Sequence, residues 1–137
     1  MSEASVIAHQ MDRLMRRIEA GLHGRAVAVD ADRVGPLGGM VLLALEEIEP
    51  APIQQLVTSM GRDKSQMTRI IQMLEMKGHL QRRQSPDDGR VSLLRLSKKG
   101  HAFVGEIKNI LSDVVGDLLT PLDPSERKAL ADILKRL

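Results

Sequence analysis

The stretch that decides the fold runs from residue 63 to residue 100 and reads DKSQMTRIIQMLEMKGHLQRRQSPDDGRVSLLRLSKKG. It opens with Asp63, an N-cap residue type, and Gln66 follows at the third position as a capping-box partner. Apolar residues then recur at helical spacing until Gly78, a common helix stop. These signals predict a helix from residue 64 to about residue 77.

The predicted helix has two different faces. Met67, Ile70, Ile71 and Leu74 share one face, and Ser65, Thr68, Arg69 and Gln72 share the opposite face at the same period. The polar face is basic and carries no acid. Such a face is most often a solvated helix surface, so its meaning depends on the elements around it.

A β-hairpin is predicted directly after this helix. Residues 80–84 and 91–96 are strand-like, and residues 85–90 join them with Pro86 and an Asp-Gly pair, which are typical of a hairpin loop.

Two further helices are predicted before residue 63. Gly35 and Pro36 begin a helix over residues 37–47 that is apolar enough, with Met40 among its residues, to be mostly buried. A turn over residues 49–52 then leads to a short helix over residues 53–60. Two helices, a capped basic helix and a hairpin, in this order, indicate a winged helix-turn-helix.

The two ends of the chain predict amphipathic helices. Ile7, Met11, Leu14, Ile18 and Leu22 follow one another at spacings of four, three, four and four. A helix capped by Ser97 extends to about residue 119, and Asp123-Pro124-Ser125-Glu126 is a capping box that begins a last helix. The fold class is therefore mainly α with a small β-hairpin wing. We expect residues 1–34 and 98–137 to form dimerisation helices and residues 35–97 a winged helix-turn-helix lobe, in one continuous structural unit.

Composition excludes several classes of function. The chain has one Phe, no Tyr and no Trp, so it lacks the aromatic platform that single-strand readers use. It has no Cys, which excludes a disulfide framework, a thiolate nucleophile and a Cys-based zinc site. No apolar run approaches the roughly 18 residues of a membrane span, and the first residues do not resemble a signal peptide. We expect a cytoplasmic protein.

Basic charge is concentrated in the middle of the chain. Residues 62–99 contain ten Lys or Arg and four Asp or Glu, a net charge of +6, whereas the whole chain carries only +2. A basic central segment is typical of a nucleic-acid partner.

Nothing in the sequence argues for an enzyme, a metal or a cofactor. Asp87 and Asp88 lie in a Pro/Gly loop, where adjacent acids usually form turns. The four histidines never pair at ligand spacing, so we expect surface or capping residues, although folding could still assemble a metal sensor.

In a winged helix-turn-helix, the second helix of the helix-turn-helix pair enters the major groove and the wing lies beside the duplex. Here that helix is the one predicted over residues 64–77. The candidate groove-reading residues are Lys64, Ser65, Gln66, Thr68, Arg69 and Gln72. The candidate wing residues are Arg82, Arg83, Asp88 and Arg90, with Arg90 at the tip positioned for an adjacent minor groove. We expect double-stranded DNA as the partner.

The motifs also resemble MarR-family regulators (multiple antibiotic resistance regulators). The resemblance rests on Thr68-Arg69, Leu74-Glu75, Gly78, Arg82-Arg83, Asp88-Gly89-Arg90 and Leu96-Ser97-Lys98-Lys99-Gly100, in this order. Ser97 replaces the usual Thr. The resemblance implies a homodimer, a pair between Asp88 and Arg90 that presents the arginine to DNA, and often a small-molecule effector.

The residues themselves support a dimer, because both ends of the chain carry broad apolar stripes without enough local partners. A two-fold dimer predicts a near-palindromic operator. Met11, Met15 and Met40 are candidates for an effector pocket, with Arg16 or Arg17 as a counter-charge for an anion, although Met is also the ordinary gap-filler of aliphatic cores. The alternative function is a protein-interaction module that uses the same fold without specific DNA binding.

Overall fold

The computed structural model describes all residues 1–137, which form six helices and three strands in two compact units. The central unit consists of residues 26–108, and the terminal unit combines residues 1–25 with residues 109–137. Helix α1 (Glu3–Val29) and helix α5 (Lys98–Leu118) each contribute residues to both units. No helix combines the length and apolarity that a membrane span requires.

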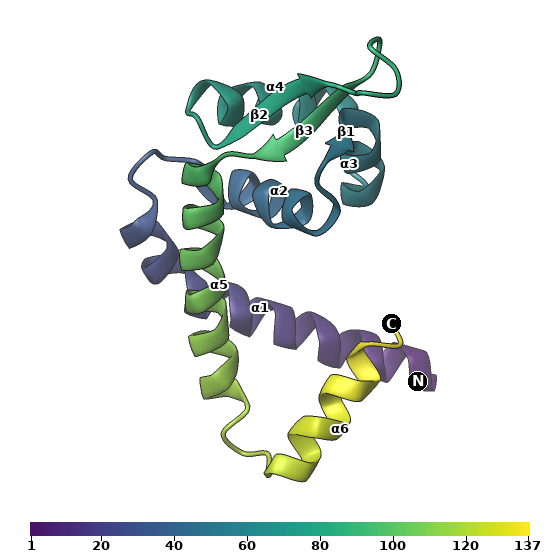
Figure 1. Cartoon of the computed structure of the whole chain (residues 1–137). Coiled ribbons are helices and arrows are strands. Elements are labelled where there is room, and N and C mark those ends of the chain that lie inside the picture. The colour runs from purple at the N-terminus through teal and green to yellow at the C-terminus, as the bar shows by residue number, and fades with distance from the viewer. The chain divides into compact units, whose positions relative to one another are not determined.

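The central unit is a winged helix-turn-helix, which confirms the predicted fold class (Figure 1). Helices α2 (Gly35–Ile48), α3 (Ile53–Met60) and α4 (Lys64–Met76) are followed by strands β2 (Leu80–Gln84) and β3 (Ser92–Leu96). Strands β2 and β3 pair antiparallel, with Leu80 opposite Leu96 and Gln84 opposite Ser92. The loop between these strands extends away from the helices as the tip of the wing.

The prediction of a two-stranded sheet was incomplete. Residues Ala51–Pro52, predicted as part of a turn, form a third strand, β1, and the sheet order is β1-β3-β2. Ala51 pairs with Leu94 and Pro52 with Leu93. Proline gives no ladder donor and is tolerated on edge strands, so a two-residue strand containing it carries almost no signal in the sequence.

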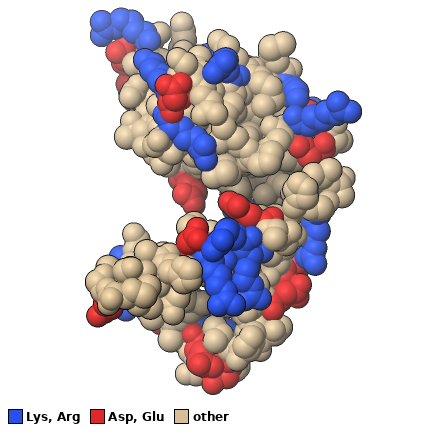
Figure 2. Space-filling view, turned by 180° about the vertical axis from the view of Figure 1, so that it is seen from behind, with Lys and Arg blue, Asp and Glu red and all other residues tan.

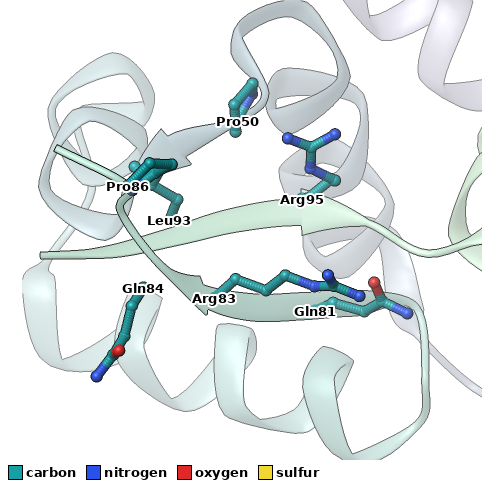
Figure 3. Close-up of a pocket in the computed structure, with 7 residues that line it drawn as sticks. All are labelled: Pro50, Gln81, Arg83, Gln84, Pro86, Leu93 and Arg95. Atoms are coloured by element: carbon teal, nitrogen blue, oxygen red, sulfur yellow. The ribbon is translucent and has the colours of Figure 1, made fainter. Parts of the chain in front are cut away.

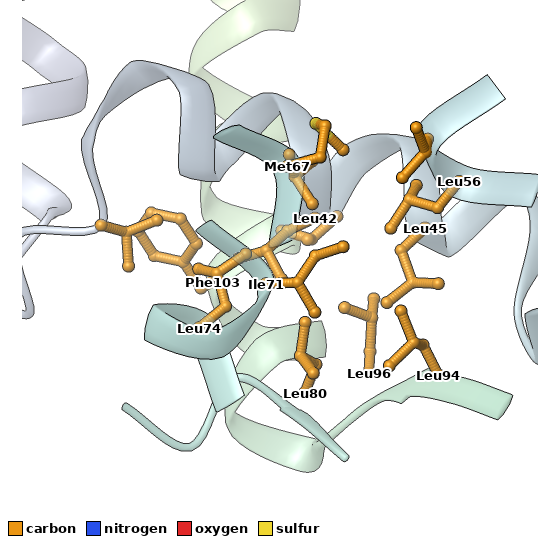
Figure 4. Packing of buried hydrophobic residues seen from close by; sticks show 14 residues of the cluster. Leu42, Leu45, Leu56, Met67, Ile71, Leu74, Leu80, Leu94, Leu96 and Phe103 are labelled. Atoms are coloured by element: carbon orange, nitrogen blue, oxygen red, sulfur yellow. The ribbon is translucent and has the colours of Figure 1, made fainter. Parts of the chain in front are cut away.

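An aliphatic core holds the central unit together (Figure 4). Helices α2, α3 and α4 and strand β3 contribute side chains that are 0% exposed, namely Val41, Leu42, Leu45, Leu56, Met67, Ile71, Leu74 and Leu94. Phe103, the one aromatic residue, comes from α5 and is 9% exposed. Full burial of one Leu or Ile side chain stabilises a fold by about 1.5–3 kcal/mol. The buried residues of α4 therefore hold this helix firmly against the rest of the central unit.

The prediction of a mostly buried α2 was wrong for Met40. Five α2 residues are buried, but the Met40 side chain is 48% exposed. Helix α2 packs against α3, α4 and β3 along the side that carries Val41 and Leu45, which leaves Met40 outside the core.

The terminal unit contains most of α1, the end of α5 and helix α6 (Pro124–Leu134). The predicted capping box is present, because Glu126 N donates to Asp123 Oδ1 at 2.9 Å and Asp123 N donates to Glu126 Oε1 at 3.0 Å. Neither α1 nor α6 contains a buried residue. Large apolar side chains are therefore exposed within this unit: Val6, Ile7, Met11, Leu14, Met15, Ile133 and Leu134.

Candidate nucleic-acid interface

A tight turn sets the start of α4. Gly61 ends α3 in the left-handed conformation, with φ of 62°, and its N–H donates to Val57 O at 3.2 Å. A Cβ is disfavoured at such an angle, which explains the glycine. Asp63 then caps α4, because its Oδ2 accepts a hydrogen bond from Gln66 N at 3.1 Å. The predicted cap at Asp63 is confirmed, but the reciprocal bond of a capping box, from Asp63 N to the Gln66 side chain, is absent.

Replacing Asp63 with alanine is expected to lower the free energy of unfolding by about 1 kcal/mol, because the cap acceptor is lost while nothing buried changes. Asp63→Asn is the matched control, since asparagine caps equally well. Thermal unfolding followed by circular dichroism would compare the two variants. If the Ala and Asn variants melted together at the wild-type temperature, the capping role would be refuted.

One face of α4 is fixed in the core and the other is free. Met67 and Ile71 are fully buried, whereas Ser65, Arg69 and Gln72 are exposed. Arg69 and Gln72 have no side-chain hydrogen bond or ion pair within the chain, so their donors are open to a partner. Lys64 is exposed and Gln66 is half-buried at the start of the same helix.

Thr68 differs from its neighbours on this face. Its Oγ1 donates a hydrogen bond to Lys64 O at 2.9 Å, one turn earlier in the helix. The side chain is half-buried and held in one orientation.

The wing tip carries an ordered arginine. Arg90 N and Nε donate to Asp88 Oδ1 at 3.0 and 3.2 Å, and Arg90 Nη2 donates to Asp88 Oδ2 at 3.3 Å. The Arg90 side chain is nevertheless 91% exposed. The side-chain hydrogen bonds from Arg90, followed by its backbone N–H, lower the pKa of the Asp88 carboxyl. The pairing that the family resemblance implies is therefore present.

The two arginines at the base of the wing lie on opposite faces of the sheet. Arg82 Nε lies 3.4 Å from Glu75 Oε2 of α4, so this guanidinium is tied to the helix. Arg83, one residue later in the strand, points to the other face because strand side chains alternate. Arg83 has no ion-pair partner in the chain. Figure 2 shows one face of the molecule, on which several Lys and Arg groups lie beside Asp or Glu.

A polar network centred on the buried His79 side chain lies in the central unit, and no motif in the sequence predicted it. His79, expected at the surface or at a cap, is only 2% exposed, and its Nε2 lies 2.9 Å from Asp32 Oδ2. Lys99 Nζ lies 2.6 Å from the same oxygen. The hydrogen bond from Lys99, opposed by partial desolvation and assisted by His79, lowers the pKa of Asp32. This network links the α1–α2 connection to the starts of β2 and α5.

The candidate effector residues divide between the two units. Met11, Met15 and Arg16 belong to the terminal unit and Met40 to the central unit. Arg16 forms an ion pair with Asp12 at 2.9 Å, and Met11 and Met15 are 47% and 57% exposed. The pocket that these residues would form stays a prediction. No group of three or more His, Cys, Asp or Glu side chains is placed to hold a metal ion.

An exposed, capped basic helix beside a β-wing defines the winged helix-turn-helix class. A sequence profile of the MarR family matches residues 39–92, which run from within α2 to the start of β3. The transcriptional repressor MprA of Escherichia coli is 33% identical over 100 residues, which are 72% of this chain and 57% of MprA. This chain belongs to the MarR family.

Two solved structures have the same fold over nearly the whole chain. The transcriptional repressor CouR, bound to a 23-mer DNA duplex, is 26% identical, with a TM-score of 0.70, covering 97% of this chain and 92% of CouR. A mutant MarR from E. coli complexed with operator DNA is 20% identical, with a TM-score of 0.73, covering 98% of this chain and 94% of that one.

Proposed function

We propose that this protein is a homodimeric, sequence-specific double-stranded DNA-binding regulator of transcription, acting as a repressor that a small-molecule effector releases. The observation that carries the proposal is the exposed face of α4, where Arg69 and Gln72 are free of internal partners, in the same unit as Arg90 of the wing. The family and the DNA complexes of CouR and MarR support this function.

Each part of the interface has a distinct task in this proposal. Helix α4 enters the major groove, where Ser65, Gln66, Thr68, Arg69 and Gln72 face base edges and Lys64 faces the backbone. Arg90 enters the adjacent minor groove, whose negative potential attracts a guanidinium group. Asp88 holds the exposed Arg90 guanidinium in one orientation and so reduces the side-chain entropy that binding would cost.

The terminal unit supplies the dimer contact. Its exposed apolar side chains on α1 and α6 have no cover within the unit, and a second copy of the chain would bury them. Residues 1–34 and 98–137 would interlock, while residues 35–97 bind DNA. A two-fold dimer places the recognition helices about 34 Å apart, so the operator should be a near-palindrome.

Release by an effector requires different affinities for two dimer geometries. Met11, Met15, Arg16 and Met40 would line the effector site. Binding, not catalysis, is the proposed activity, and the cytoplasm is its location because that is where such an operator is accessible.

The first experiment is a fluorescence-anisotropy titration of a labelled duplex, because the protein itself has neither Tyr nor Trp. The duplex carries the promoter of the protein's own gene, and a scrambled duplex serves as control, each at low and physiological salt. Tight, sequence-preferring binding that weakens steeply with salt is expected. Equal, weak binding to both duplexes would favour the protein-interaction module instead.

Replacing Arg90 with alanine is expected to weaken DNA binding on the order of tenfold, since one charge-assisted contact is lost in the minor groove. The dimer should remain intact, which sedimentation analysis would check. Lys128→Ala, which removes an α6 cation paired with Asp132, is the matched control. Unchanged affinity in Arg90→Ala would remove the wing from the interface.

A further inference from the structure

A groove of about 370 Å³ lies on the outer face of the sheet, opposite the core (Figure 3). Gln81 and Arg83 of β2, Leu93 and Arg95 of β3, and Pro50 before β1 line it. This groove is separate from the α4 face, because Arg82 and Glu75 lie on the other side of β2.

Strand register brings two arginines to this one face. Gln81 lies opposite Arg95, and Arg83 lies opposite Leu93. Arg83 and Arg95 are therefore diagonal neighbours across the strand pair, within reach of long side chains. In Figure 3, Arg83 lies along β2 toward Gln81, and Arg95 rises from β3 on the side of Pro50.

Neither charge is compensated within the chain. Arg82 pairs with Glu75 and Arg90 pairs with Asp88, but neither Arg83 nor Arg95 forms a salt bridge, and no acid lines the groove. Like charges on one face of a strand pair repel each other, so two diagonal arginines without an acidic partner leave their donors open to an anion.

The rest of the groove limits the class of anion. Leu93 is half-buried and, with Pro50 and Pro86, gives apolar surface beside the cationic side chains. A bare oxyanion would leave that surface uncovered. A phosphate joined to a sugar matches both parts, because the guanidinium forks donate to phosphate oxygens and the sugar carbons cover Leu93 and the prolines.

We propose that this groove, named here the outer-wing groove, binds a sugar-phosphate group through Arg83 and Arg95, with the Gln81 amide as a further donor. The group has two possible sources: the DNA backbone beside the operator, or a free sugar phosphate. The first source rests on the proposed function and would extend the footprint beyond α4 and the wing tip. The second source does not depend on DNA binding.

The first arm of the test uses the free protein. Arginine Nε–Hε signals are followed by ¹H–¹⁵N NMR during titration with 2-deoxyribose 5-phosphate, with inorganic phosphate and 2-deoxyribose as comparison probes. The Arg83 and Arg95 signals should shift and saturate together, at lower concentration with the sugar phosphate than with phosphate alone. Arg95→Ala should abolish the Arg83 shift, whereas Lys128→Ala should not.

The second arm measures operator affinity against salt concentration. If the groove holds backbone phosphate, Arg95→Ala should make the log–log slope shallower by about 0.9 for each lost contact, or about 1.8 for a two-fold dimer. Arg95→Gln should reproduce this change, and matched circular dichroism melts would show that both variants are folded.

The outcomes separate the two proposals. A slope change assigns the groove to the DNA backbone, and saturable binding without one assigns it to a free sugar phosphate; either supports the site. Saturable binding in a protein that binds no duplex would retain the groove and reject the DNA-binding function. Normal operator binding, with neither a saturable shift nor a slope change, would reject the sugar-phosphate site in the outer-wing groove and leave the proposed DNA-binding function intact.

Discussion

Replacement of Gly100 by alanine is expected to lower the free energy of unfolding by about 2–4 kcal/mol, among the largest effects of any single substitution in this chain. A Cβ built at Gly100 would lie 2.0 Å from the carbonyl oxygen of His79, a backbone atom. That oxygen already accepts a hydrogen bond from Ser97 N at 3.1 Å. The first turn of α5 therefore packs directly on the start of β2.

Neither side of this contact is free to move away. Ser97 Oγ donates to Gly78 O at 2.6 Å and accepts from Gly100 N at 3.0 Å, so one hydroxyl joins the two segments. His79 is in turn held by Asp32. A methyl group at residue 100 would break several of these bonds at once.

Gly105→Ala is the matched control, because it lies in the same helix and its added Cβ would meet nothing within 4 Å. Alanine is favoured over glycine inside a helix by about 0.5–1 kcal/mol, so this variant should melt at or above the wild-type temperature. Chemical denaturation would give both free energies. Equal stabilities for the two variants would contradict the close approach at Gly100.

Replacement of Arg69 by alanine is expected to weaken operator binding by about 1–3 kcal/mol for each recognition helix, roughly 5- to 150-fold. Arg69 is exposed in the middle of α4 and its guanidinium has no partner in the chain. Stability should hardly change, because the core residues of α4 are on the other face. Anisotropy titration against the operator and a scrambled duplex measures the loss.

Two comparisons sharpen this experiment. Arg69→Lys retains the charge and loses the bidentate fork, so it should retain nonspecific binding while losing preference for the operator. Lys128→Ala should bind as the wild type does. If Arg69→Ala preserved both affinity and preference, α4 would not be the reading element in this orientation.

Features set by neighbouring residues could be predicted from the sequence. The caps at Asp63 and Asp123, the strand β2 and the hairpin each depend on residue types a few positions apart, so local chemistry determines them. The exposed face of α4 follows from the same periodicity.

Features that depend on distant residues could not be predicted. Strand β1 exists because Ala51 meets Leu94, and His79 is buried because Asp32, 47 residues earlier, pairs with it. Arg82 and Arg83 are adjacent and identical in the sequence. In the sheet they lie on opposite faces, so Arg82 pairs with Glu75 and Arg83 has no ion-pair partner. No spacing pattern in the sequence predicts these contacts between distant residues.

The internal bond of Thr68 restricts which bases this residue can recognise. Its hydroxyl proton is already used on Lys64 O, so toward a groove it presents only lone pairs and a methyl group. It would then accept from the amino group of adenine or cytosine, or rest against the methyl of thymine, and it would have no proton for the acceptor edge of guanine. At the base pair that Thr68 contacts, guanine would therefore be disfavoured because Thr68 has no free proton to donate. Recognition of guanine would instead depend on the unpaired guanidinium group of Arg69.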